Sequence, residues 1–265
     1  MRLPPILAAL FAVSACVQPA QVSMNRPQAD SGVGFGTPGG RPAAVAPVGA
    51  SSMARDFMDL TFAMESGRGL SVFSRFEGPV TVGLAGDVPA SAARDLGDLI
   101  ARLRGEAGID ISPASGPATI TVEFVGRSDL RRYAPSAACF VVPNVSSLAE
   151  YRRLRGTAAV DWTRVTTRER AAIFIPTDTS PQEVRDCLHE ELAQALGPLN
   201  DLYRLPDSVF NDDNIHAVLT GFDMLVLRAY YDPALRNGMS RGDVAARLPG
   251  ILARLNPGGE GGDAL

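Results

Sequence analysis

Apolar residues recur at helical spacing in the stretch that begins at Ser180. They fall three or four positions apart and mark one face of a helix: Val184, Leu188, Leu192 and Ala195. Ser180 and Glu183 have the spacing of a capping box, which predicts the start of this helix. Gly197, followed by a proline, predicts its end. We therefore expect a helix over residues 180–197.

Shorter patterns predict the other elements. Apolar or alternating runs indicate strands at 80–84, 109–111, 118–124, 138–142 and 171–175. Helical spacing indicates helices at 57–64, 90–107, 219–231 and 244–255. This order predicts an α+β fold, in which helices pack on a twisted sheet and the C-terminal part is helical.

The N-terminus reads as an export signal. The apolar run of residues 6–13 is too short to span a bilayer as a permanent helix. The next residues, Val13-Ser14-Ala15-Cys16, resemble a bacterial lipobox. This resemblance implies that residues 1–15 are a signal peptide, that Cys16 carries lipid, and that the protein faces the periplasm. The absence of aspartate after Cys16 favours the outer membrane over the inner. The alternative is an ordinary signal peptide cleaved after Ala15.

Composition divides the rest of the 265-residue chain. Residues 16–50 are rich in Pro, Gly, Ala and Ser and are expected to form a flexible tether. Residues 51–256 are long enough for a single domain, and the Gly-rich residues 257–265 are expected to be a mobile tail. The formal net charge of −4 gives no reason to expect nucleic-acid binding.

Export also changes how the cysteines are interpreted. If Cys16 carries lipid, Cys139 and Cys187 remain as an even pair in an oxidising compartment. We predict a disulfide between them. The alternative is two separate buried thiols, because free cysteine is a common core residue.

The stretch from Glu190 to Gly197 resembles the active-site helix of the metzincin zinc peptidases, of the matrixin type. Their pattern is H-E-x-x-H-x-x-G-x-x-H, followed by a turn that contains methionine. With Gly197 aligned on the pattern's glycine, the three metal-ligand positions hold Glu190, Gln194 and Asn200, and Glu191 stands at the catalytic glutamate. Ser208-Val209-Phe210 resembles the methionine turn, with Phe210 in place of methionine.

This resemblance implies a metzincin-like mixed sheet with an antiparallel edge strand at 138–142 that lines a cleft. The E-E-x-x-Q-x-L-G stretch also resembles a family of predicted bacterial lipoproteins with no assigned activity. Neither resemblance supplies a function for a chain without the zinc ligands.

A zinc site needs imidazole ligands that this helix lacks. Glu190, Gln194, and Asn200 or Asp201 are oxygen donors that suit calcium, magnesium or manganese better than zinc. The chain has only two histidines, His189 and His216, which could share a metal only if the fold brought the second over the helix. We therefore expect no metal and no cofactor, and zinc least of all.

Three functions fit the sequence. The first is an envelope lipoprotein, membrane-bound through lipid, that binds a peptide or envelope polymer in the former cleft without hydrolysing it. The second is a hydrolase in which Glu191 acts as general base. The third is a structural lipoprotein with no cleft ligand. The first is the function we expect.

Overall fold

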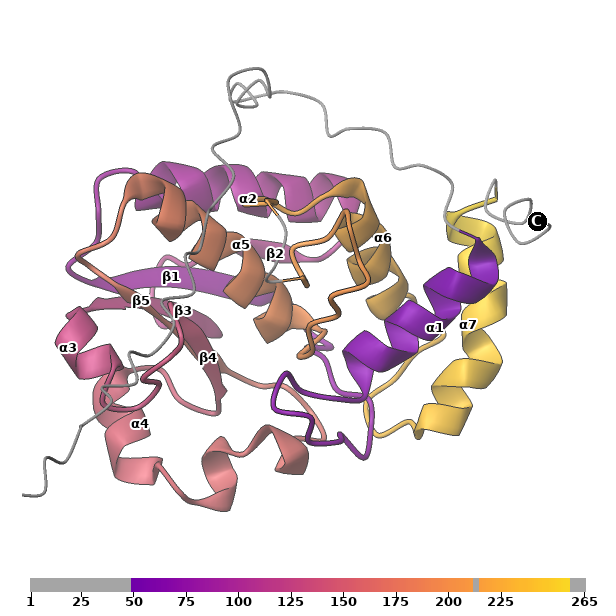
Figure 1. Cartoon of the computed structure of the whole chain (residues 1–265), viewed down its shortest axis with the longest axis horizontal. Coiled ribbons are helices and arrows are strands. Elements are labelled where there is room, and N and C mark those ends of the chain that lie inside the picture. Colours follow the sequence, from indigo (N-terminus) through magenta and orange to yellow (C-terminus); the bar gives the residue numbers. More distant parts are fainter. Residues whose placement is uncertain (1–48, 212–214, 258–265) are drawn as a thin grey trace, which may run out of the picture. The chain divides into compact units, whose positions relative to one another are not determined.

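Five strands form one mixed sheet in the order β2-β1-β3-β5-β4 (Figure 1). A computed structural model of the chain describes residues 49–211 and 215–257. The strands are β1 (Val80–Gly86), β2 (Ile111–Pro113), β3 (Ile120–Val125), β4 (Phe140–Pro143) and β5 (Ala171–Pro176). Only β4 runs antiparallel to its neighbour, pairing Phe140 with Phe174 and Val142 with Ala172. The predicted mixed sheet with an antiparallel edge strand is confirmed.

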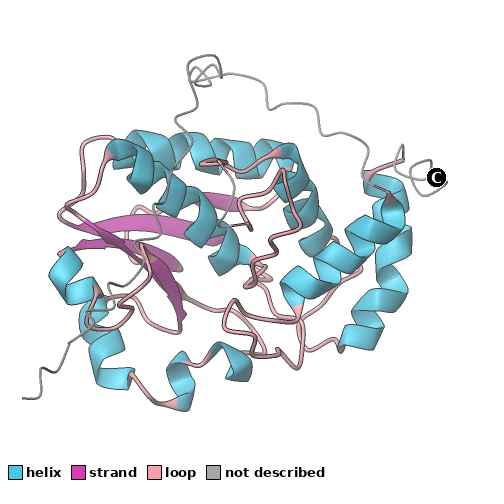
Figure 2. Cartoon of the chain, viewed as in Figure 1, coloured by secondary structure: helices cyan, strands magenta, loops and turns pink. Residues whose placement is uncertain are grey.

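Seven α-helices accompany the sheet in the described part of the chain (Figure 2). They are α1 (Ala50–Thr61), α2 (Ala92–Glu106), α3 (Arg127–Leu130), α4 (Leu148–Leu154), α5 (Pro181–Leu196), α6 (Gly221–Tyr230) and α7 (Arg241–Leu255). Two 3₁₀ turns follow α4: η1 (Ala158–Val160) and η2 (Trp162–Arg164). None of these helices is long and apolar enough to cross a membrane.

Strand β5 is buried on both faces, which is why it reads as a continuous apolar run. Ala171, Ile173 and Ile175 face the main core, which includes residues of α2 and α5. Ala172 and Phe174 face a second core with residues of α3 and α4. Because side chains alternate along a strand, one short segment organises two hydrophobic layers.

Helix α5 begins at the predicted capping box. The Ser180 hydroxyl accepts from the Glu183 amide, and the Glu183 carboxylate accepts from the Ser180 amide. That backbone hydrogen bond is the main reason why the pKa of Glu183 falls to about 2. At the other end, a Cβ at Gly197 would come within 3.1 Å of the Tyr230 ring. Glycine therefore ends this helix because α6 packs directly against it.

Two buried arginines hold the C-terminal ends of helices. Arg168 donates to the Gln194 and Ala195 carbonyls at 2.6 and 2.7 Å and also to the Gly197 carbonyl at the end of α5. Arg75 donates to the Tyr230 and Asp232 carbonyls at the end of α6. The last carbonyls of a helix lack partners within it and carry partial negative charge, so a guanidinium satisfies them and stabilises the end.

Some predicted boundaries are wrong. Helix α1 starts at Ala50, well before the predicted 57–64, and β2 lies at 111–113, just after the predicted 109–111. Helix α1 lies beside α7, so its apolar face is set by packing against an element nearly 200 residues away (Figure 1).

Candidate functional site

Three carboxylates from separate segments converge next to α5. One oxygen each of Glu65, Glu190 and Asp201 lies within 4.8 Å of the others. We call these three residues the carboxylate cluster. Gln194, one turn after Glu190 on α5, donates from Nε2 to Glu65 Oε1 at 2.6 Å. The predicted site residues Glu190, Gln194 and Asp201 are thus brought together, with Glu65 as an addition that no sequence motif indicated.

The backbone fixes Glu65 in this place. Met64 and Leu199 form a parallel bridge, and the Glu65 amide donates to the Leu199 carbonyl at 3.1 Å. The turn closes through the Met64 amide, which donates to the Arg68 carbonyl, and Gly67 takes the left-handed conformation at φ 75°. The turn after α1 is therefore attached to the chain that leaves α5.

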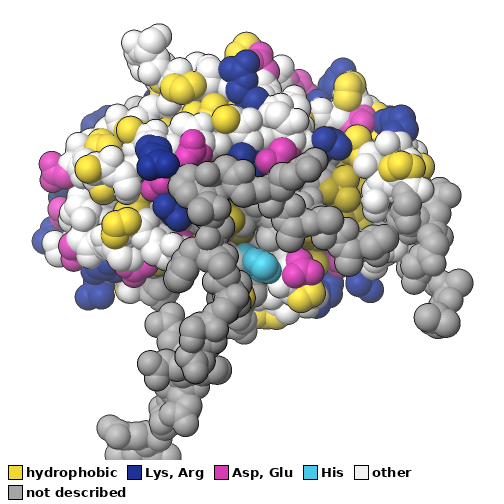
Figure 3. Space-filling view, turned by 90° about the horizontal axis from the view of Figure 1, so that it is seen from above, with side chains coloured by type: hydrophobic (Ala, Val, Ile, Leu, Met, Phe, Trp, Pro, Cys, Tyr) yellow, Lys and Arg dark blue, Asp and Glu magenta, His cyan; other side chains and the backbone are white. Residues whose placement is uncertain are grey.

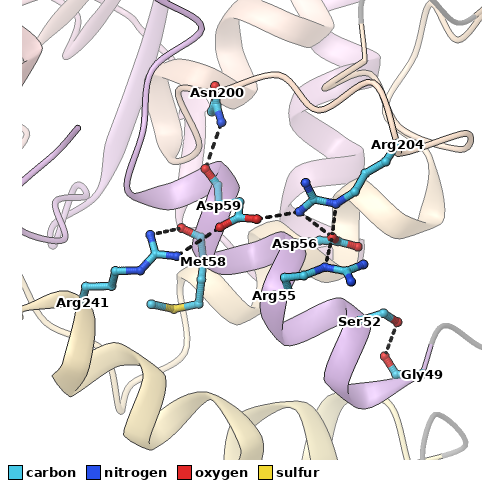
Figure 4. Close-up of polar contacts among 9 residues, drawn as sticks. All are labelled: Gly49, Ser52, Arg55, Asp56, Met58, Asp59, Asn200, Arg204 and Arg241. Carbon is cyan, nitrogen blue, oxygen red and sulfur yellow. Dashed lines mark hydrogen bonds and ion pairs between the residues drawn. The ribbon is translucent and has the colours of Figure 1, made fainter. Parts of the chain in front are cut away.

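The Asn200 side chain makes its hydrogen bond with α1. Its Nδ2 donates to the Asp59 carbonyl at 3.0 Å, which ties it to α1 (Figure 4). The Asp59 carboxylate also accepts from Arg204 and Arg241, so α1 is joined both to this loop and to α7. Burial alone would raise the pKa of Asp59. The guanidinium groups of Arg204 and Arg241 have the larger combined effect, so the pKa of Asp59 is lowered. The Asn200 side chain therefore attaches the loop after α5 to α1, while the neighbouring Asp201 reaches the carboxylate cluster.

Glu191, the predicted general base, lies on α5 and is only 4% exposed. Gln194 is 5% exposed. Glu65, in contrast, is exposed, and Glu190 is half-buried. A ligand from solvent would therefore meet Glu65 and Glu190 first, and Glu191 only after some rearrangement.

The two histidines have separate roles. His189 is 5% exposed, and its Nδ1 accepts from the Leu219 amide at 3.0 Å. Burial, with smaller contributions from Arg102 and Arg185, lowers the pKa of His189 to about 3, so the imidazole is neutral. His216 Nε2 lies 3.6 Å from a carboxylate oxygen of Asp207. His189 therefore uses a ring nitrogen to hold the segment that leads into α6.

Ser208 and Phe210, the residues of the turn that resembles a methionine turn, are fully buried. The Ser208 hydroxyl donates to Asp223 at 2.6 Å, and the Val209 amide donates to the other oxygen at 3.2 Å. Asp223 is also the capping-box residue of α6, and its burial raises its pKa. This turn is thus fastened to the start of α6, with the Phe210 ring in the core.

A disulfide joins Cys139 to Cys187, with the two Cα atoms 6.0 Å apart. The predicted pairing is confirmed. It links the residue before β4 to the middle of α5 and so holds the edge strand near the helix that carries Glu190.

The outer edge of β4 is partly covered. Trp162 donates from Nε1 to the Val141 carbonyl at 3.3 Å, and Pro143 has no amide hydrogen to offer. The Asn144 side chain donates to the Ala159 carbonyl, which fixes η1 nearby. A partner strand would find the Val141 carbonyl already bonded and no amide hydrogen at Pro143.

Residues 50–250 match the family described as a protein of unknown function, DUF2927. The chain belongs to this family. No curated protein matches it. The DUF2927 match begins where α1 begins and includes the whole sheet, α5 and the carboxylate cluster, so this family shares the segments that build the site.

The donor set at this DUF2927 site consists of carboxylates and one amide. Zinc sites in proteins are built mainly from imidazole and thiolate ligands, and this set contains neither. Clustered carboxylates suit a harder divalent ion such as calcium, or an amine or guanidinium group. On the uncovered part of the face in Figure 3, basic and acidic side chains are interspersed with apolar ones.

Proposed function

We propose that this protein is a lipid-anchored envelope protein whose metzincin-like domain does not hydrolyse peptides. Instead, it binds a peptide or envelope polymer through a cationic group at the carboxylate cluster. The observation that carries the proposal is the convergence of Glu65, Glu190 and Asp201 beside the helix that would carry zinc ligands in a peptidase.

The order of elements supports the metzincin-like assignment. Strand β1 is followed by helix α2 and then by four more strands. Among these, β4 is the antiparallel edge strand and pairs with β5. Helix α5, with Glu190 and Glu191, follows the fifth strand directly. Fold alone does not establish an activity, so the function rests on the residues of the site.

The residues on α5 support the loss of hydrolysis. Gln194 is hydrogen-bonded to Glu65, and Glu191 is buried. Peptide hydrolysis needs a group that polarises the substrate carbonyl as well as a base. The hydrolase alternative requires Glu191 to reach a substrate, and its burial argues against that.

The chemistry of the carboxylate cluster supports a cationic ligand. Three neighbouring carboxylates repel one another, and a bound guanidinium or ammonium relieves this repulsion while forming charge-assisted hydrogen bonds. Glu65 is exposed, so such a group can approach from solvent. A lysine or arginine side chain, or the amine of an envelope polymer, has this chemistry.

Calorimetric titration with a short arginine-containing peptide tests this function. We expect saturable binding that weakens about tenfold or more in Glu190→Gln, because one charge-assisted hydrogen bond is lost. Glu169→Gln, at an exposed position outside the cluster, is the matched control and should bind as the unaltered protein does.

Equal affinity of all three proteins, or no binding, would refute the proposed site. Calcium provides a second comparison, because the carboxylate oxygens are close enough to share one ion. A calcium-dependent rise in melting temperature that is lost in Glu190→Gln, without peptide binding, would assign the cluster to a metal instead.

A further inference from the structure

A concave surface outside the carboxylate cluster is lined in part by Met64 and Arg68, on the turn that carries Glu65. It is a groove of about 430 Å³ between this turn and the segment that follows α4. Its size falls in the range of roughly 300–1000 Å³ that is usual for small-ligand sites. We call it the η groove, because η1 and η2 form one wall.

The apolar wall of the η groove consists of Met64, Tyr151 and Trp162. Trp162 is held rigidly, since its Nε1 donates to the Val141 carbonyl and its ring lies 4.8 Å from the Arg168 guanidinium. It is 7% exposed, so the groove meets a small part of a fixed ring. A ligand would therefore find a preformed apolar surface with little to reorganise.

The rim of the η groove carries one positive charge in excess. Arg68 donates to Asp161 at 3.0 Å and to the Thr163 hydroxyl at 3.2 Å, so these opposite charges offset each other. The hydrogen bond from Arg68 is the first cause of the lowered pKa of Asp161. Arg164 also lines the groove and is exposed, and its side chain makes no hydrogen bond or ion pair within residues 49–211 and 215–257.

We propose that the η groove binds a carboxylate that is attached to an apolar group, such as the end of a peptide with an apolar last residue. The Arg164 guanidinium receives the carboxylate, because its planar fork matches two carboxylate oxygens. The apolar group packs against Met64, Tyr151 and Trp162. This site is separate from the carboxylate cluster, and its ligand carries the opposite charge.

The only tryptophan of the chain provides the measurement, because Trp162 lines the η groove. N-acetyl-phenylalanine should change the fluorescence of the full chain in a saturable way, and calorimetry should give the same affinity. N-acetyl-phenylalaninamide, which lacks the carboxylate, should bind about tenfold or more weakly. Acetate, which lacks the apolar group, should also bind more weakly.

Arg164→Ala should weaken binding of N-acetyl-phenylalanine about as much as removing its carboxylate does. Arg153→Ala, at an exposed position on α4 outside the η groove, is the matched control and should leave the affinity unchanged. The proposal would be overturned if N-acetyl-phenylalanine and its amide bound with equal affinity, or if Arg164→Ala bound the acid as tightly as the unaltered protein does. The absence of binding by both methods would also overturn it. The probe carries no cation, so these outcomes do not depend on the carboxylate cluster.

Discussion

His189 is the neighbour of Glu190 on α5, yet its imidazole is directed into the protein. The folded chain holds it neutral with a pKa of about 3, whereas an exposed histidine titrates near 6.5. As the pH falls below about 6.5, protons bind preferentially to the unfolded chain. The titration of His189 therefore lowers the free energy of unfolding as the solution becomes acidic. The loss is about 1.4 kcal/mol for each pH unit, until the pH reaches the pKa of His189 in the folded chain.

His189→Asn should remove this pH dependence. Asparagine can still accept a hydrogen bond from the Leu219 amide, but it does not titrate. Between about pH 6.5 and 4.5 the unaltered protein should lose about 2–3 kcal/mol more of its unfolding free energy than the variant does. Urea unfolding at both pH values measures this difference. Parallel losses in the two proteins would show that His189 is not buried as described.

Individual roles were only partly predictable from the sequence. Glu190 and Gln194 could be placed near each other, because they are four residues apart on one helix. The metzincin resemblance indicated Asn200 as the third residue, with Asp201 only as its neighbour, and it is Asp201 that reaches the cluster. Arg168 could not be distinguished from the exposed arginines around it, since its burial depends on helix α5 ending beside it. Glu65 could not be predicted either, because a bridge between distant segments places it.

At the scale of elements, the Cys139–Cys187 disulfide connects the edge strand to α5 across 48 residues. Cys139→Ala together with Cys187→Ala should lower the unfolding free energy by about 2–4 kcal/mol, chiefly because the unfolded chain gains freedom. Chemical unfolding of both proteins under non-reducing conditions measures this loss. The double variant should also weaken binding at the carboxylate cluster, as α5 loses an anchor. An unchanged unfolding midpoint would contradict a structural role for the bond.

Helices with their own start signals were the most predictable elements. The capping box at Ser180 predicted the start of α5. Helix α1 has no side-chain cap, so its early start was missed. The prediction placed strand β2 two residues too early. The three residues of this strand are positioned by pairing with β1 rather than by a pattern of their own.

At the scale of the whole molecule, the proposed lipid anchor at Cys16 would fix where the protein acts. Cys16 lies outside the described residues, as do the predicted signal peptide, most of the tether and nearly all of the tail. Cys16→Ser should prevent acylation, which holds proteins to membranes through the burial of acyl chains. Membrane fractionation should then find the variant as an unprocessed precursor or in soluble fractions. Unchanged mature protein in the membrane fraction would contradict the lipobox interpretation.

The fold as a whole was more predictable than its site. Alternating patterns and the metzincin resemblance correctly indicated a mixed sheet with β4 antiparallel at the edge. They did not indicate that Trp162 would cover part of that edge, because this contact joins a loop to a strand 21 residues away. Loop conformation depends on such contacts, so the sequence predicted the scaffold but not the surfaces beside it.

The zinc content of two purified proteins tests most directly whether this is a metzincin-like domain that has lost its metal site. The unaltered chain should contain no stoichiometric zinc. Glu190→His combined with Gln194→His should gain about one zinc per chain, because two imidazoles one helical turn apart and the Asp201 carboxylate would supply three ligands. Stoichiometric zinc in the unaltered chain would contradict the proposed loss of the metal site. A double variant that folds but binds no zinc would contradict the metzincin-like arrangement.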